Sequence, residues 1–111
     1  MIEVEQSEGL RIIRFSESRL DAANAPNFRT SVAGAMDDKP DRVLLDMEEV
    51  QFLDSTGLGT LVSILKMMGP NGVLAISGAQ PAVKRLLEIT RMNTVFRLFE
   101  TRQDAEQALR S

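Results

Sequence analysis

A change of hydrophobic period in the middle of the chain constrains the fold more than any other feature. The apolar run Val43–Leu45 is typical of a buried strand, and residues 46–57, which mix polar and apolar types, then lead into an apolar stripe at helical spacing. That stripe consists of Leu58, Leu61, Val62, Leu65 and Met68. A buried strand followed by an amphipathic helix is a building unit of α/β folds. The sequence therefore predicts a strand-to-helix junction within residues 50–59.

The remaining segments continue this alternation. We expect strands at residues 2–5, 10–15, 42–47, 73–76 and 95–99, and helices that begin near residues 21–24, 57, 80 and 101. Residues 7–9 are expected to form the turn of an N-terminal hairpin, and residues 16–20 a polar linker. Strands that alternate with helices pair in parallel through right-handed crossovers. The predicted fold class is α/β, a single domain of residues 1–111 with a mostly parallel mixed sheet, an N-terminal β-hairpin and the order β-β-α-β-α-β-α-β-α.

The composition excludes several kinds of site. The 111 residues include no cysteine and no histidine, which rules out disulfides, thiolate nucleophiles, serine–histidine triads and zinc sites built from those ligands. The net charge of -3 argues against nonspecific nucleic-acid binding, which needs a basic face. Neither a signal-peptide pattern nor an apolar run of membrane length is visible, so we expect a cytoplasmic protein without direct membrane insertion. These features favour a protein that is not an enzyme and that binds another protein.

A serine lies at the predicted junction between strand and helix. Asp54 and Ser55 both suit the N-cap position, where a side-chain oxygen accepts from the exposed N–H groups of the helix. Ser55 is therefore either a helix cap or a site where a phosphate is added and removed. Gly57 and Gly59 each weaken the helix start by roughly 1 kcal/mol relative to alanine. Bare backbone at these positions indicates either tight internal packing or the close approach of a partner.

The residues of this junction resemble those of a known family. The string Asp54–Gly59, preceded by Leu44–Met47, is similar to the phosphorylation loop of bacterial anti-sigma factor antagonists, which are single STAS domains. Arg19–Ala22 resembles the acidic loop after the family's hairpin, and Pro81–Leu87 resembles its third helix. The resemblance covers nearly the whole chain in the same order. One departure is Ser18, where the family usually has glycine.

This resemblance implies a partner switch. The unmodified antagonist binds an anti-sigma factor that is also a serine kinase of the GHKL ATPase type, and the sigma factor is freed. The kinase uses ATP and Mg²⁺ to phosphorylate the serine after the aspartate, here Ser55, and a PP2C-type phosphatase restores the bare hydroxyl. The resemblance implies that ATP and Mg²⁺ belong to the kinase, so we expect no cofactor in this domain. The adjacent Thr56 is the second choice for phosphorylation.

We expect two aspartates to lie together beside this serine. Asp21 and Asp54 each follow a predicted strand, at ends that meet on the same edge of a sheet. They orient Ser55 toward the kinase or contact basic groups of the partner, or else each caps a helix. The predicted partner-binding residues are Asp21, Asp54, Ser55, Thr56, Gly57, Leu58 and Gly59.

Two other functions compete with this interpretation. One is a STAS subunit that acts as a scaffold without phosphorylation, for example in a lipid-transport ABC complex or as a relative of anion-transporter tails. A serine after Asp54 is not needed for scaffolding, which favours the switch. The other is a small hydrolase with Ser55 as nucleophile, which the missing histidine and the absence of a Gly-x-Ser-x-Gly elbow disfavour.

Overall fold

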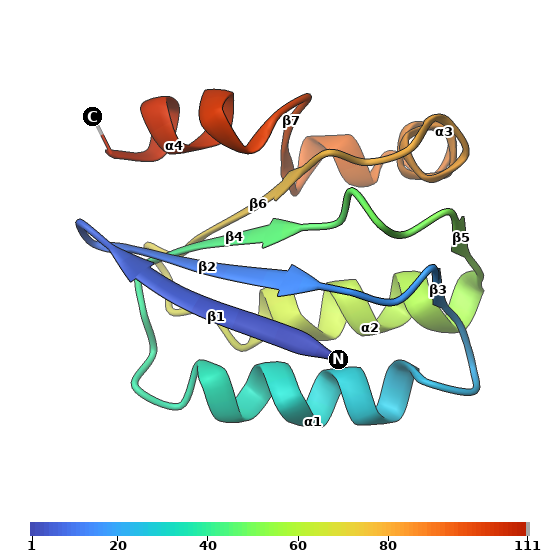
Figure 1. Ribbon diagram of the computed structural model, residues 1–111, viewed down its shortest axis with the longest axis horizontal. Helices are drawn as coiled ribbons and strands as arrows, with labels where there is room; N and C mark the ends of the chain where they lie inside the picture. Colours follow the sequence, from blue (N-terminus) through green and yellow to red (C-terminus); the bar gives the residue numbers. More distant parts are fainter. Residues whose placement is uncertain (111) are drawn as a thin grey trace.

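A five-stranded sheet forms the centre of the structure, a computed structural model that describes residues 1–110 (Figure 1). Its strands are β1 (Ile2–Ser7), β2 (Leu10–Phe15), β4 (Arg42–Asp46), β6 (Val73–Ser77) and β7 (Arg97–Phe99), in the spatial order β1-β2-β4-β6-β7. β1 and β2 form an antiparallel hairpin, and the other neighbouring pairs are parallel. The predicted mixed sheet with an N-terminal hairpin is confirmed.

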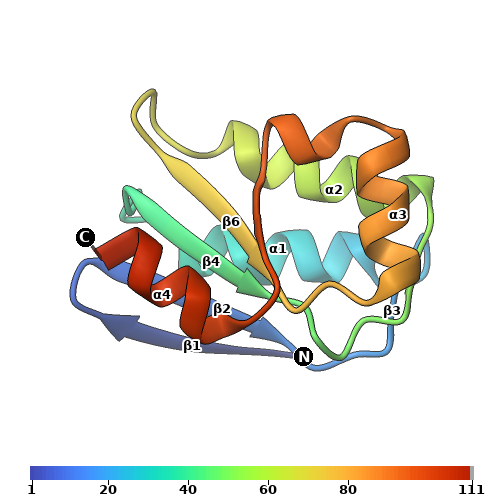
Figure 2. The same ribbon diagram turned by 90° about the horizontal axis from the view of Figure 1, so that it is seen from above.

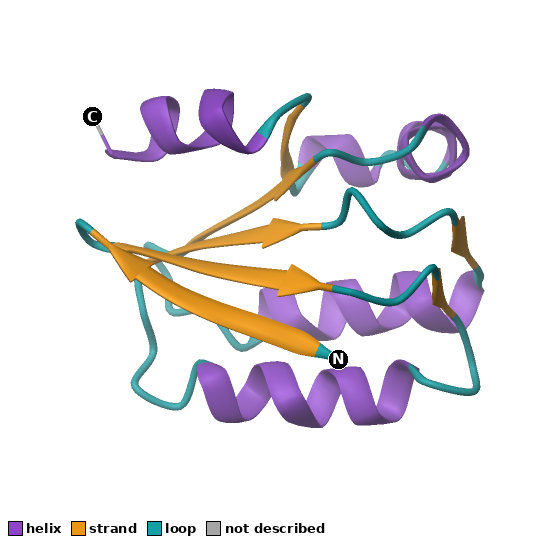
Figure 3. Cartoon of the chain, viewed as in Figure 1, coloured by secondary structure: helices purple, strands orange, loops and turns teal. Residues whose placement is uncertain are grey.

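Helices cover both faces of this sheet. α1 (Ala25–Ala35) and α2 (Ser55–Lys66) lie side by side on one face, and α4 (Arg102–Arg110) lies on the other (Figures 1 and 2). α3 (Pro81–Ile89) lies beyond the ends of the parallel strands, and the short 3₁₀ helix η1 (Met92–Thr94) follows it. The arrowheads of β2, β4 and β6 all point toward that end of the molecule (Figure 3). No helix within residues 1–110 combines the length and the apolar composition needed to span a membrane.

Alternating side chains along the strands build two apolar layers. Ile13 and Phe15 of β2 face α1 and α2, while Leu10 and Ile12 face α4. In the larger layer the rings of Phe15 and Phe28 pack with their centroids 4.5 Å apart. The central strands β4 and β6 are thus buried on both faces, as their continuous apolar runs predict, whereas the edge strand β1 is mostly exposed.

A second, two-stranded sheet was not predicted. Residues 16–20, expected to be a linker, contain β3 (Arg19–Leu20), which pairs in parallel with β5 (Phe52–Leu53). The linker expectation is wrong for these two residues. Strands of two residues are too short to show an alternating pattern in the sequence. Their pairing brings the segment after the hairpin against the segment that precedes α2.

α2 buries a different stripe from the one predicted. Its buried residues are Gly57, Thr60, Leu61 and Ile64. Only Leu61 belongs to the predicted stripe, whose other members are half-buried: Leu58, Val62, Leu65 and Met68. The reason is steric. Gly57 lies so close to the backbone of β3 that the helix turns its smallest residue toward that strand.

Candidate functional site

The loop between β5 and α2 is held by the carboxylate of Asp54. Asp54 Oδ1 accepts a hydrogen bond from the Gly57 N–H at 2.8 Å, which caps α2. Asp54 Oδ2 accepts from the Ala22 N–H at 3.1 Å, which ties the loop before α1 to the start of α2. Of the two residues that suited the N-cap, Asp54 therefore takes that role, and the interpretation of Ser55 as the cap is wrong.

Ser55 is the first residue of α2 and is exposed. Within residues 1–110 its hydroxyl has no hydrogen-bond partner, and neither do the backbone N–H groups of Ser55 and Thr56. Thr56 is also exposed, and its carbonyl accepts from Thr60 Oγ1 at 3.0 Å. Both hydroxyls are thus open to solvent at a helix end that carries positive partial charge. The preference for Ser55 over Thr56 stays a prediction.

Because Asp54 caps α2 and Ser55 does not, replacing these two residues should change the free energy of unfolding by different amounts. Asp54→Ala removes the acceptor of two backbone N–H groups and should lower the free energy of unfolding by about 1–2 kcal/mol. Ser55→Ala removes a hydroxyl without a partner and should change it by no more than about 0.5 kcal/mol. Urea unfolding of both variants at neutral pH measures the difference. Equal losses would show that Ser55 shares the capping role.

Asp21 follows β3 and Asp54 follows β5, so the two aspartates lie together as expected, although at the end of the unpredicted small sheet and not at the edge of the main one. Its Oδ1 accepts from the Ala23 N–H at 3.0 Å, and its Oδ2 accepts from Arg19 Nε at 3.0 Å. The hydrogen bond from Arg19 lowers the pKa of the Asp21 carboxyl from its ordinary value. The Asp21 side chain therefore shapes a tight turn, and the interpretation of Asp21 as the cap of α1 is wrong.

The residue at the N-cap position of α1 is Asn24, whose side chain does not cap the helix. Asn24 Oδ1 accepts from the Asp21 N–H at 2.9 Å, and Asn24 Nδ2 donates to the Arg19 carbonyl at 2.7 Å. These bonds fold residues 19–24 into a turn against the β5–α2 loop. The amide of Asn24 thus supports the placement of Asp21.

The two glycines near the start of α2 are explained by different surroundings. A Cβ at Gly57 would lie 2.3 Å from the Leu20 carbonyl oxygen and 2.7 Å from Leu53 Cδ1, so tight internal packing explains this glycine. A Cβ at Gly59 would meet no atom within 4 Å. Gly57 is buried and supports the loop from beneath, whereas Gly59 is exposed. Bare backbone at the surface is thus found at Gly59.

An exposed apolar surface adjoins the loop. Phe52, two residues before Asp54, is 44% exposed and borders a shallow groove of about 310 Å³ between β5 and α3. The groove is lined by Gln51, Phe52, Leu53, Ala82, Arg85, Leu86 and Ile89. Its lining was not predicted as part of the site. No local pattern in the sequence distinguishes the exposed Phe52 from its buried apolar neighbours Val50 and Leu53.

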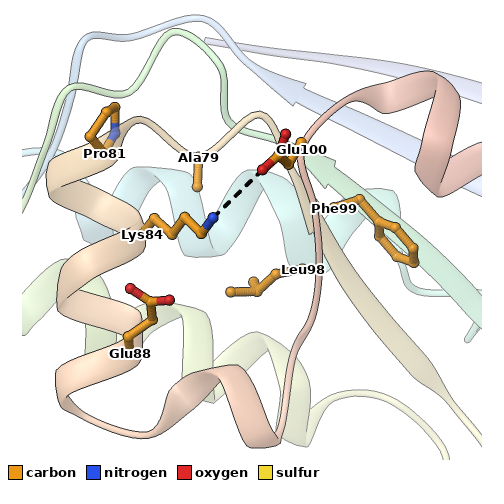
Figure 4. A pocket seen from close by; sticks show the side chains of 7 residues that line it. All are labelled: Ala79, Pro81, Lys84, Glu88, Leu98, Phe99 and Glu100. Atoms are coloured by element: carbon orange, nitrogen blue, oxygen red, sulfur yellow. Dashed lines mark ion pairs between the residues drawn. The ribbon is translucent and has the colours of Figure 1, made fainter.

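A second groove lies on the opposite face of α3, away from the β5–α2 loop. It has a volume of about 520 Å³ and is bordered by α3 and β7 (Figure 4). Lys84 Nζ and Glu100 Oε1 form an ion pair across it at 3.8 Å, and Glu88 and Phe99 also line it. In the part of the chain that the structure describes, no three histidine, cysteine or acidic side chains are arranged to hold a metal ion.

Comparison with known proteins identifies relatives over nearly the full length. The STAS domain family model matches residues 1–105. The anti-sigma F factor antagonist of Paenibacillus polymyxa is 26% identical over 94% of this chain and 90% of its own length. The anti-sigma-B factor antagonist of Staphylococcus aureus is 30% identical over 73% of this chain and 76% of its own. The crystal structure of an anti-sigma factor antagonist from Mycobacterium paratuberculosis matches with a TM-score of 0.91 and 25% identity, over 100% of this chain and 94% of that one.

Proposed function

Because the chain belongs to the STAS domain family, we propose that it is an anti-sigma factor antagonist whose binding is switched by phosphorylation of Ser55. The unmodified protein binds an anti-sigma factor that is also a GHKL-type serine kinase. Phosphorylation by that kinase releases the complex, and a PP2C-type phosphatase resets it. The names of the relatives support the antagonist role.

The observation that carries the proposal is the free hydroxyl of Ser55. A kinase needs a hydroxyl that can reach its ATP without first breaking the fold. Ser55 meets this need because it is exposed and its hydroxyl makes no hydrogen bond within residues 1–110, while Asp54 caps the helix. ATP and Mg²⁺ belong to the kinase in this scheme, and the STAS domain supplies the acceptor and the docking surface.

The N-terminal end of α2 can also accommodate a phosphorylated Ser55. A phosphate on Ser55 lies at the positive end of α2, where an anion is favoured by roughly 0.3–1 kcal/mol. The nearby carboxylates of Asp21 and Asp54 offset part of that gain. The phosphate therefore acts mainly on the partner, which contacts Asp21, Asp54, Ser55, Thr56, Leu58 and Gly59, with Gly57 supporting this surface from beneath.

The test is phosphorylation by the GHKL-type kinase encoded nearest to the gene of this protein. With Mg²⁺ and ATP, we expect the intact mass of the protein to rise by one phosphate, and Ser55→Ala to abolish that gain. The matched control Thr56→Ala should still be phosphorylated. Stoichiometric phosphate on Ser55→Ala would move the acceptor to Thr56. A wild-type protein that neither binds the kinase nor gains phosphate would contradict the proposed function and favour the scaffold alternative.

A further inference from the structure

Arg19 is held in one orientation beside the β5–α2 loop. Its guanidinium carbon lies 4.5 Å from the centroid of the Phe52 ring, a cation–π contact between the paired strands β3 and β5. Its Nε donates to Asp21 Oδ2 at 3.0 Å. The Arg19 side chain is nevertheless 60% exposed. A flat cation is thus fixed against an aromatic ring and left open to solvent.

The two terminal nitrogens of this guanidinium are available. Within residues 1–110 neither Nη1 nor Nη2 of Arg19 makes a hydrogen bond. A guanidinium whose Nε is already used keeps its outer pair of nitrogens as a planar fork, which matches the two oxygens of a carboxylate. Because the ring and Asp21 hold the fork, little conformational freedom remains to be lost when an anion binds.

Stability does not explain this arrangement. An exposed ion pair between close neighbours contributes little to folding. A phenylalanine that remains 44% exposed leaves apolar surface in water. Both residues border the proposed docking surface, since Phe52 lies three positions before Ser55 and also borders the groove along α3.

Each carboxylate oxygen of the two aspartates on the same surface already accepts one hydrogen bond, and each keeps a second lone pair. Both oxygens of Asp54 accept backbone N–H groups, from Gly57 and Ala22. Both oxygens of Asp21 also accept, from Ala23 and Arg19. Within residues 1–110, two cations on this surface have nitrogens without a partner: Arg19 at its two outer nitrogens, and Arg85 in the groove beside Phe52. Of these two, Arg19 is the one held against an aromatic ring. The expectation that the aspartates bind basic groups of the partner stays a prediction, and Arg19 adds a donor of opposite charge beside them.

We propose that Arg19, stacked on Phe52, recognises a carboxylate of the anti-sigma factor, so that the partner presents an aspartate or glutamate next to Ser55. The proposal rests on the proposed function, because it takes this end of the molecule to be the docking surface. It also explains how a phosphate on Ser55 would directly weaken binding of the partner. A dianion on Ser55 lies near the partner's carboxylate, repels it and competes for the same guanidinium.

Binding of the GHKL-type kinase to charge-reversed variants tests the proposal when the wild-type protein binds that kinase. Arg19→Glu is expected to raise the dissociation constant on the order of 100-fold, as for loss of a desolvated charge pair. Arg19→Lys, which keeps the charge without the fork, should raise it by about 10-fold. The control Lys66→Glu makes the same charge change at the far end of α2 and should stay within about 3-fold of wild type. Equal affinities for Arg19→Glu and Lys66→Glu would overturn the proposal.

If the wild-type protein binds no such kinase, a second measurement tests whether Arg19 recognises carboxylates. A short peptide of alternating glutamate and leucine is titrated into the labelled protein, and the Arg19 Nε–H and Phe52 ring signals are followed by NMR. We expect both signals to shift, and a lysine–leucine peptide of equal length to leave them in place. Shifts with the acidic peptide would support the role of Arg19 although the proposed function has failed. Unmoved signals would overturn both.

Discussion

Phosphorylation of Ser55 is expected to lower the affinity for the anti-sigma factor by roughly 30- to 3,000-fold and to leave the fold intact. A phosphoserine adds about −1.5 to −2 charges at neutral pH. An uncompensated charge buried at an interface costs on the order of 2–5 kcal/mol, and each 1.4 kcal/mol is about a tenfold change in affinity. Within the free protein the helix end offsets the added charge, so the free energy of unfolding should change by about 1 kcal/mol or less.

Both quantities can be measured on one preparation. Titration calorimetry with the partner gives the dissociation constants of the unmodified and the phosphorylated protein, and urea unfolding of the same samples gives their stabilities. Ser55→Ala should bind like the unmodified protein, whereas Ser55→Asp should bind poorly. Equal affinities of the two phosphorylation states would refute the switch. A large loss of stability on phosphorylation would mean that the phosphate acts by disrupting the fold.

Gly57→Ala is expected to destabilise the protein by about 3 kcal/mol, near the upper end of the range for overpacking. The new Cβ would lie 2.3 Å from the Leu20 carbonyl oxygen, which belongs to the backbone and cannot rotate away. The first turn of α2 must then move away from β3, and the surface around Ser55 moves with it. We therefore expect weaker partner binding as well as lower stability.

Gly59→Ala is the matched control for this substitution. It lies in the same helical turn, and its Cβ would meet no atom within 4 Å. Since alanine is the better helix former, Gly59→Ala should raise the free energy of unfolding by up to about 1 kcal/mol. Thermal and urea unfolding of the two variants should therefore give opposite signs. If Gly57→Ala proved as stable as Gly59→Ala, the close packing of α2 on β3 would be wrong.

Hydrophobic period was sufficient to predict the long elements of the fold. The run Val43–Leu45 marked the buried strand, and the spacing that follows it marked α2. Hydrophobic period could not predict β3 and β5, because these two-residue strands form only by pairing with each other and have no recognisable local pattern. It also placed the buried face of α2 slightly wrongly. Apolar character located the face, but the closest approach is made by Gly57, which has no side chain.

Local sequence patterns were likewise insufficient to assign the roles of residues in the candidate site. The sequence located the junction and its aspartate and serine, but both suited the N-cap, and local preference alone could not decide between them. The structure assigns the cap to Asp54. One of its oxygens accepts from the Gly57 N–H of α2, and the other accepts from the Ala22 N–H of a distant segment. The stacking of Arg19 on Phe52 likewise depends on two segments that are far apart in the chain. Contacts of this kind need the tertiary structure.

The double attachment of Asp54 has a consequence for the proposed phosphorylation of Ser55. One carboxylate anchors its own helix and the neighbouring turn together, so the serine beside it is part of a stiff corner and not of a pliable strand. Most peptide-modifying enzymes draw an extended substrate into a cleft. In the proposed switch, the kinase and the phosphatase would each have to bring a concave surface to a hydroxyl on a fixed backbone. Their selectivity then comes from reading a three-dimensional shape, which a linear copy of the same residues does not reproduce.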